Sequence, residues 1–167
     1  MDTNTTINRI NELIEIVPAK IKVLPAGEFD FRKLPDKWSK KEILGNLCDS
    51  AINNLSRFIR AQFEPKPFAV NRYDQDIWVR ACAYRQVQQE DILSLWLALN
   101  RQIVNVIKQY TSEMLEYECY FDGGEFSNYT AAEKPGYTGT GGKRTMYWLI
   151  DDYEAHMEYH LHQIMDY

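Results

Sequence analysis

The chain of 167 residues contains three histidines, His156, His160 and His162. His156 and His160 are four residues apart, so on a helix with 3.6 residues per turn their side chains stack one turn apart on one face. Two imidazoles at this spacing can bind one divalent metal ion from a single helix, as in helical zinc sites. The pattern therefore predicts two ligands of a metal centre.

The helix that carries the pair determines which way the imidazoles point. A helical projection places His156 and His160 beside Leu149 and Tyr153, at the edge of an apolar stripe, and places His162 on the opposite side. We therefore expect the pair to face the interior and His162 to face water.

An alternative interpretation is a solvated or structural histidine pair, since such pairs also occur without a metal. The segment 156–160, HMEYH, differs from the HExxH motif of zinc proteases. Glu158 points away from the histidine face, so it cannot serve as the general base of such a protease. We do not expect a protease.

Four amphipathic segments supply the elements that must position these residues. Apolar residues at helical spacing predict helices over about 5–17, from Ser39 to before Pro65, over about 87–110, and from about 144 to 167. Pro18 is expected to end the first helix. Ser39 and Glu42 form a capping box that starts the second.

The connections between these helices are long, at about 62–86 and 111–143. Both have room for short strands or helical turns, and the aromatic segment 117–121 is a candidate strand. Four long helices with such connections predict an all-α fold, a four-helix bundle with long crossover connections. We expect a single domain that spans residues 1–167.

Composition and charge limit the function further. The formal net charge is −5 and no basic run occurs, so we expect no nucleic-acid partner. The three cysteines are far apart, which fits reduced thiols better than a disulfide framework or a zinc ribbon. The sequence shows no secretory signal and no apolar stretch of ~20 residues, so we expect a cytoplasmic protein without a membrane partner.

A glycine-rich segment at 136–143, GYTGTGGK, invites comparison with a phosphate-binding loop. A Walker motif ending there needs glycine in place of Tyr137 and Ser or Thr in place of Arg144. We therefore expect a flexible loop that leads into the last helix.

Three segments together resemble the DinB/YfiT-like superfamily. Residues 38–51, WSKKEILGNLCDSA, resemble its second-helix signature W-S-x-x-E-x-x-x-H-L-x-D. Residues 71–78, NRYDQDIW, are similar to a segment before its third helix, and residues 151–161, DDYEAHMEYHL, to its closing H-x-x-x-H helix. The resemblance implies a four-helix bundle, often dimeric. It also implies a site of three residues, usually histidines, that holds zinc or nickel and leaves one position open to water.

The sequence departs from this pattern at Asn46, where the family has its first histidine. An amide oxygen is a weaker ligand for zinc or nickel than an imidazole. Either Asn46 completes a weakened site with His156 and His160, or a carboxylate such as Asp49 or Asp152 does so. Otherwise the site has decayed.

A line of polar residues on the second predicted helix bears on this choice. Asn46, Ser50, Asn53 and Arg57 recur at i, i+4, i+7 and i+11, so they share one side of the helix. The line either borders a cleft or is the solvent face of the helix.

Two hypotheses about function follow. Characterised members of the family include thiol-cofactor-dependent transferases and isomerases. The resemblance thus implies a hydrolase or thiol-cofactor-dependent transferase that depends on a divalent metal, Zn or Ni, held in a degenerate site by His156, His160 and Asn46. Such a protein would be a homodimer acting on a small molecule whose identity the sequence does not reveal. The alternative is a non-catalytic bundle that has lost the metal and binds a small molecule or a partner.

Overall fold

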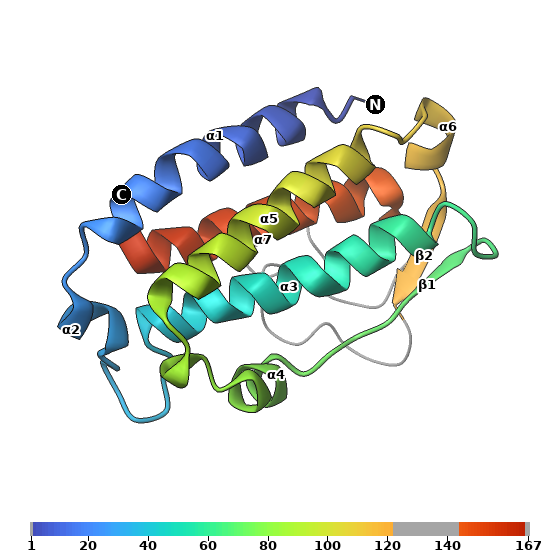
Figure 1. Ribbon diagram of the computed structural model, residues 1–167. Coiled ribbons are helices and arrows are strands. Elements are labelled where there is room, and N and C mark those ends of the chain that lie inside the picture. The colour runs from blue at the N-terminus through green and yellow to red at the C-terminus, as the bar shows by residue number, and fades with distance from the viewer. Residues whose placement is uncertain (1, 122–143, 166–167) are drawn as a thin grey trace.

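The computed structural model describes residues 2–121 and 144–165. Four long helices dominate it: α1 (Asn4–Lys22), α3 (Lys40–Arg60), α5 (Gln89–Ile107) and α7 (Met146–Met165) (Figure 1). They correspond to the four segments predicted as helices, so the four-helix bundle is confirmed. None of the described helices is long and apolar enough to cross a membrane.

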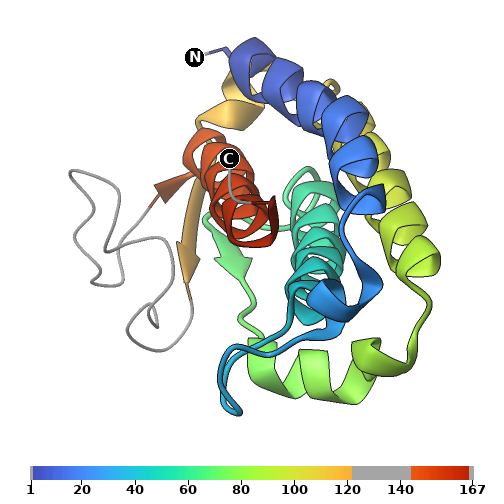
Figure 2. The same cartoon turned by 90° about the vertical axis from the view of Figure 1, so that its left-hand side faces the viewer.

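The long helices pack as a ring that does not follow their order in the sequence. α3 packs against α5 and α7, and α1 packs against the same two helices, so α1 and α3 occupy opposite corners (Figure 2). α3 and α5 run in one direction, whereas α1 and α7 run in the other (Figure 1). The two helices that carry the candidate ligands, α3 and α7, are therefore antiparallel neighbours.

The start of α3 is fixed by the capping box that the sequence predicts. The Ser39 hydroxyl accepts a hydrogen bond from the Glu42 backbone N–H at 3.2 Å, and the Glu42 carboxylate accepts one from the Ser39 N–H at 2.9 Å. Arg32 forms an ion pair with the same carboxylate. These local contacts fix the residue at which α3 begins.

The prediction that Pro18 ends the first helix is wrong. α1 continues to Lys22 with Pro18 inside it. A proline in a helix interior removes one backbone hydrogen bond and crowds the preceding turn. Ile14, Val17 and Ile21 are all buried on one face around it, and burial of these side chains in the bundle core keeps the last turn helical.

The core consists of the facing apolar sides of the four long helices, and it includes Ile10, Leu47, Trp96 and Ile150. Two residues that spacing assigns to these stripes lie outside the core: Ile59 and Leu95 are each 42% exposed.

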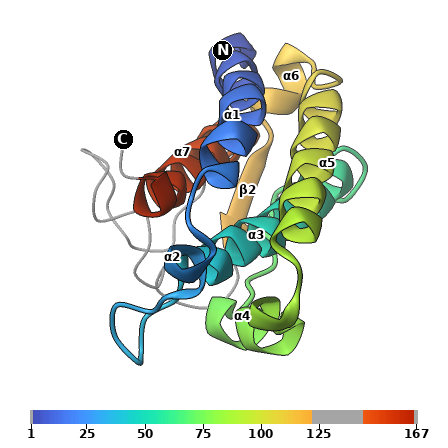
Figure 3. The same ribbon diagram turned by 60° about the vertical axis from the view of Figure 1, so that its left-hand side comes forward.

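The two long connections contain the smaller elements. These are α2 (Ala26–Asp30) before α3, and then β1 (Phe68–Val70), α4 (Gln75–Cys82), η1 (Tyr84–Gln86), α6 (Ser112–Leu115), β2 (Glu118–Phe121) and β3 (Arg144–Thr145). α2 and α6 lie at opposite ends of the bundle (Figure 3).

The three strands form a small sheet in which β2 is central, parallel to β1 and antiparallel to β3. The candidate strand at 117–121 is thus confirmed as β2. The glycine-rich segment 136–143 lies outside the described residues.

Candidate metal centre

The predicted histidine pair lies on α7 and faces the interior of the bundle. His156 is 8% exposed and His160 is 2% exposed, and their ring centroids are 4.6 Å apart. His162 is exposed, as its position on the opposite side of the helix predicts. Glu158 also points away from the pair, since it forms an ion pair with Arg9 of α1.

Hydrogen-bonding groups contact the Nδ1 atom of each imidazole. The Nδ1 atom of His160 lies 2.9 Å from the amide oxygen of Gln163, and that of His156 lies 3.5 Å from the Ser50 hydroxyl. Because the Gln163 oxygen only accepts, Nδ1 of His160 carries the proton and Nε2 carries the lone pair. A hydrogen bond of this kind to the remote nitrogen orients histidines that bind metals through the other one.

Both imidazoles are neutral at physiological pH. Burial, with smaller contributions from the neighbouring His160 and Arg57, lowers the pKa of His156 to about 3. Burial also lowers the pKa of His160. A neutral imidazole is the form that donates a lone pair to a metal ion, so burial keeps the pair ready to bind one.

The contact between Ser50 and His156 fixes how α3 and α7 align. Because the two helices are antiparallel, a step of four residues towards the N-terminus of α3, from Ser50, matches a step of four residues towards the C-terminus of α7, from His156. Asn46 therefore lies level with His160. A ring contact between Phe58 and Tyr153, with centroids 6.0 Å apart, agrees with the antiparallel direction of the two helices.

Asn46 is fully buried, with 0% of its surface exposed. Both its amide oxygen and its amide nitrogen are buried, and neither forms a hydrogen bond within the described part of the chain. Ser50 is buried as well, and Asn53 and Arg57 are half-buried. The polar line on α3 is thus not a solvent face, and that interpretation is wrong.

Within the described residues, neither carboxylate considered as a substitute ligand joins the histidine pair in a group of three that could hold a metal ion. Asp49 is buried, but its Oδ1 atom accepts a 2.6 Å hydrogen bond from the Tyr84 hydroxyl, and the Cys82 thiol lies 3.7 Å from the same oxygen. Asp152 is half-buried one turn before His156. Among residues 2–121 and 144–165, no three His, Cys, Asp or Glu side chains form a group that could hold a metal ion. Asn46 is therefore the remaining candidate for a third ligand.

Tyr84 holds Asp49 in place and Gly45 leaves room for the Tyr84 ring, and the sequence analysis singled out neither residue. The ring of Tyr84 lies flat against Gly45, where a Cβ atom would be 2.2 Å from the ring. Burial raises the pKa of Asp49, and the Tyr84 hydroxyl opposes this rise. Gly45 lies inside the second predicted helix, and this position could have indicated the close packing from the sequence. Glycine weakens a helix and often marks a place where another group packs closely.

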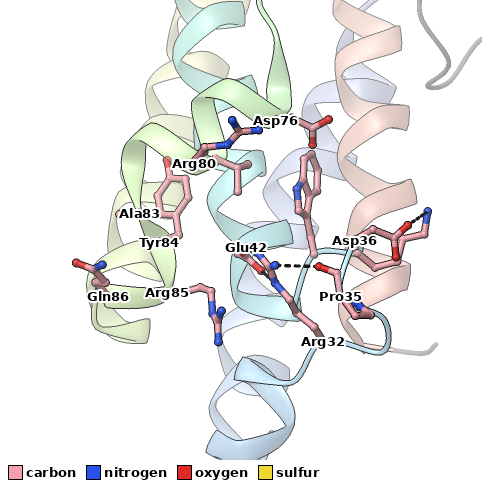
Figure 4. A pocket seen from close by; sticks show the side chains of 13 residues that line it. Arg32, Pro35, Asp36, Glu42, Asp76, Arg80, Ala83, Tyr84, Arg85 and Gln86 are labelled. Carbon is pink, nitrogen blue, oxygen red and sulfur yellow. Dashed lines mark hydrogen bonds and ion pairs between the residues drawn. The ribbon is translucent and has the colours of Figure 1, made fainter.

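A cavity of about 490 Å³ opens at the start of α3 (Figure 4). Trp38, Val79, Ala83 and Tyr84 are among the residues that line it. The Arg32–Glu42 ion pair lies at its wall, and neither histidine nor Asn46 lines it. The cavity and the candidate metal centre are thus separate features of α3.

Comparison with known proteins identifies the fold. No family model matches the chain, and no curated protein matches it. A solved structure, that of YfiT from Bacillus subtilis, is similar with a TM-score of 0.75 over 99% of this chain and 87% of that one, at 18% sequence identity. The chain has the YfiT fold. YfiT is described as a probable metal-dependent hydrolase with an unusual four-helix bundle topology. The resemblance to YfiT that the sequence motifs indicate is confirmed at the level of fold.

Proposed function

We propose that the protein is a divalent-metal-dependent hydrolase whose metal is held by His156, His160 and Asn46. The observation that carries the proposal is the buried amide of Asn46. It lies level with His160 and forms no hydrogen bond with a described residue. An unsatisfied buried polar group costs about 1–3 kcal/mol, and a bound metal ion would provide the amide oxygen with a partner.

The three side chains fit a metal such as Zn²⁺ or Ni²⁺. Two neutral imidazoles supply nitrogen ligands and the amide supplies an oxygen ligand. Three protein ligands leave a fourth position for water, which is the usual arrangement in catalytic zinc sites. The amide is the weakest member of the set, so we expect lower metal affinity than a site with three imidazoles would have.

His156, His160 and Asn46 would hold the metal, which would supply a bound water of lowered pKa as a nucleophile at neutral pH. The chain itself orients the two imidazoles and buries them away from water. Gln163 and Ser50 contact the remote nitrogens of the two imidazoles and fix the ring planes. The packing of α3 on α7 buries both rings, which keeps them unprotonated.

The similarity to YfiT supports hydrolysis, since that protein is described as a probable metal-dependent hydrolase. The family resemblance also implies a second chemistry, a group transfer that depends on a thiol cofactor. A reaction that proceeds only when a small thiol is added would identify the transferase.

We further propose, from the resemblance, a cytoplasmic homodimer acting on a small molecule. Light scattering tests the dimer against the 19.7 kDa mass of one chain.

Elemental analysis of protein purified without a histidine tag tests the metal. We expect about one equivalent of zinc or nickel per chain and hydrolysis of an activated ester such as 4-nitrophenyl acetate. A chelator should abolish the hydrolysis and added Zn²⁺ should restore it. Protein that neither contains a metal nor binds added Zn²⁺ would refute the proposal and favour the non-catalytic bundle.

A further inference from the structure

Arg57 lies on α3 in line with Asn46 and Ser50, and it is half-buried. One terminal nitrogen donates a hydrogen bond to the Asn54 side-chain oxygen at 3.1 Å, and the other donates one to the Asn71 carbonyl oxygen at 2.5 Å. The guanidinium carbon lies 5.9 Å from the centroid of the Tyr73 ring. The side chain therefore spans from α3 to the segment between β1 and α4.

Arg57 lacks the carboxylate partner that three other half-buried arginines have. Arg9 pairs with Glu158, Arg32 with Glu42 and Arg60 with Glu64. Arg57 forms no ion pair with any carboxylate in the described ranges, and both of its hydrogen-bond acceptors are neutral.

A guanidinium has five N–H donors, so three of those on Arg57 have no acceptor among the described residues. Burial lowers the pKa of Arg57, and the nearby Tyr73, Asp152 and Cys119 raise it only in part. Placing a cation here without a directly paired carboxylate is unfavourable in the protein alone, and an anionic ligand bonded to it would reverse that.

The position of Arg57 relates this cation to the candidate metal centre. Arg57 follows Ser50 by two helical turns, about 10 Å along α3, and an arginine side chain can cover much of that distance. Its charge acts on His156, which is in contact with Ser50. The proposed ligands, two imidazoles and an amide, are all neutral, so they leave the charge of a divalent metal uncompensated. The metal and Arg57 would together present a strongly positive surface to a substrate.

We infer that Arg57 binds an anionic oxygen group of the substrate, a carboxylate or a phosphate, beside the metal centre. The inference rests on the proposed function for its site and extends it to a class of substrate. A guanidinium matches both groups because its planar fork donates two parallel hydrogen bonds to two oxygens. Arg57 thus selects and positions the substrate, whereas the imidazoles and the amide hold the metal.

Titration calorimetry with benzoate and with phenyl phosphate tests this inference and distinguishes the two anions. Both probes are titrated into the metal-free protein and into the Zn²⁺-loaded protein. We expect at least one probe to bind both forms, more tightly when Zn²⁺ is present. Arg57→Gln should weaken binding at least tenfold in both forms, since hydrogen bonds to charged groups are the strong ones. Arg60→Gln is the matched control, because Arg60 lies one turn further along α3 and is paired with Glu64; it should leave the affinity unchanged.

Arg57→Lys keeps the charge but removes the fork, so it should bind the probe several-fold more weakly than the parent does. It also serves as the test if Arg57→Gln fails to fold. If neither probe binds the parent protein, or if Arg57→Lys binds as tightly as the parent, the inference is wrong. If Arg57→Gln lowers only the melting temperature and leaves the affinity unchanged, Arg57 is a structural tie and the inference is again wrong.

The two proposals fail separately. Zn²⁺ binding without any anion binding would overturn the role of Arg57 and leave the metal centre intact. Anion binding that depends on Arg57 in a protein that takes up no Zn²⁺ would overturn the metal centre and leave the anion site intact.

Discussion

Replacing Gly45 by alanine should destabilise the protein, although alanine is the better helix former. The added Cβ would lie 2.2 Å from Cδ2 and 2.3 Å from Cγ of Tyr84, whereas ordinary contacts begin at 3.4 Å. These are ring atoms close to the backbone, so no flexible chain end can move aside. The ring must retreat by more than an ångström, which also breaks the 2.6 Å hydrogen bond from the Tyr84 hydroxyl to Asp49.

The magnitude follows from three contributions. Overpacking costs about 1–3 kcal/mol. Losing a hydrogen bond to a buried carboxyl group costs about 1–3 kcal/mol. Alanine in place of glycine returns about 1 kcal/mol of helix propensity. We therefore expect Gly45→Ala to lower the free energy of unfolding by about 3 kcal/mol, measured by urea denaturation at neutral pH.

The control is the same substitution in a Tyr84→Ala background, where no ring opposes the new methyl group. There Gly45→Ala should be neutral or should stabilise the protein by up to about 1 kcal/mol. The difference between the two backgrounds measures the coupling of Gly45 to Tyr84. An equal loss in both backgrounds, or a stabilising effect in the parent protein, would contradict the close packing of Tyr84 on Gly45.

Three further predictions concern the metal centre. Asn46→His should raise Zn²⁺ affinity at least tenfold by calorimetry at neutral pH, with the gain weakening below about pH 6; unchanged affinity would mean that residue 46 does not face the pair. Added Zn²⁺ should raise the melting temperature, His160→Ala should remove that rise, and His162→Ala should preserve it; equal effects would contradict the orientation of α7. The metal-free protein should lose stability as pH falls below about 6.5, because the lowered pKa values of His156 and His160 make protons bind the unfolded chain first. The loss should reach up to about 1.4 kcal/mol per pH unit for each histidine, and for His156 it should continue down to about pH 3. Denaturation curves that do not change between pH 7 and 5 would refute the burial of both rings.

Features that depend on a few neighbouring residues could be predicted from the sequence. The Ser39–Glu42 capping box is complete within one turn, so its residue types suffice to place the start of α3. The inward direction of His156 and His160 follows from their position beside Leu149 and Tyr153 on the same helix.

Features that depend on distant partners could not be predicted in the same way. Pro18 remains helical because Val17 and Ile21 bury against other helices, which no local rule for proline includes. Asn46 and Ser50 look like a solvent face until α7 is placed beside α3. Polar residues on a buried helix face are the exception to amphipathic patterning, and such exceptions concentrate at functional sites.

The antiparallel contact of α3 with α7 joins parts of the chain that are 106 residues apart at Ser50 and His156. A metal ion held by Asn46 on one helix and the histidines on the other would act as a removable cross-link that closes a loop containing α5. A metal ion that binds only the folded chain stabilises it by about 2.7 kcal/mol when free metal is present at 100 times the Kd. Metal uptake would therefore fasten α3 to α7 across the stretch of chain between them. Removal of the metal would withdraw this stabilisation from the contact between the two helices.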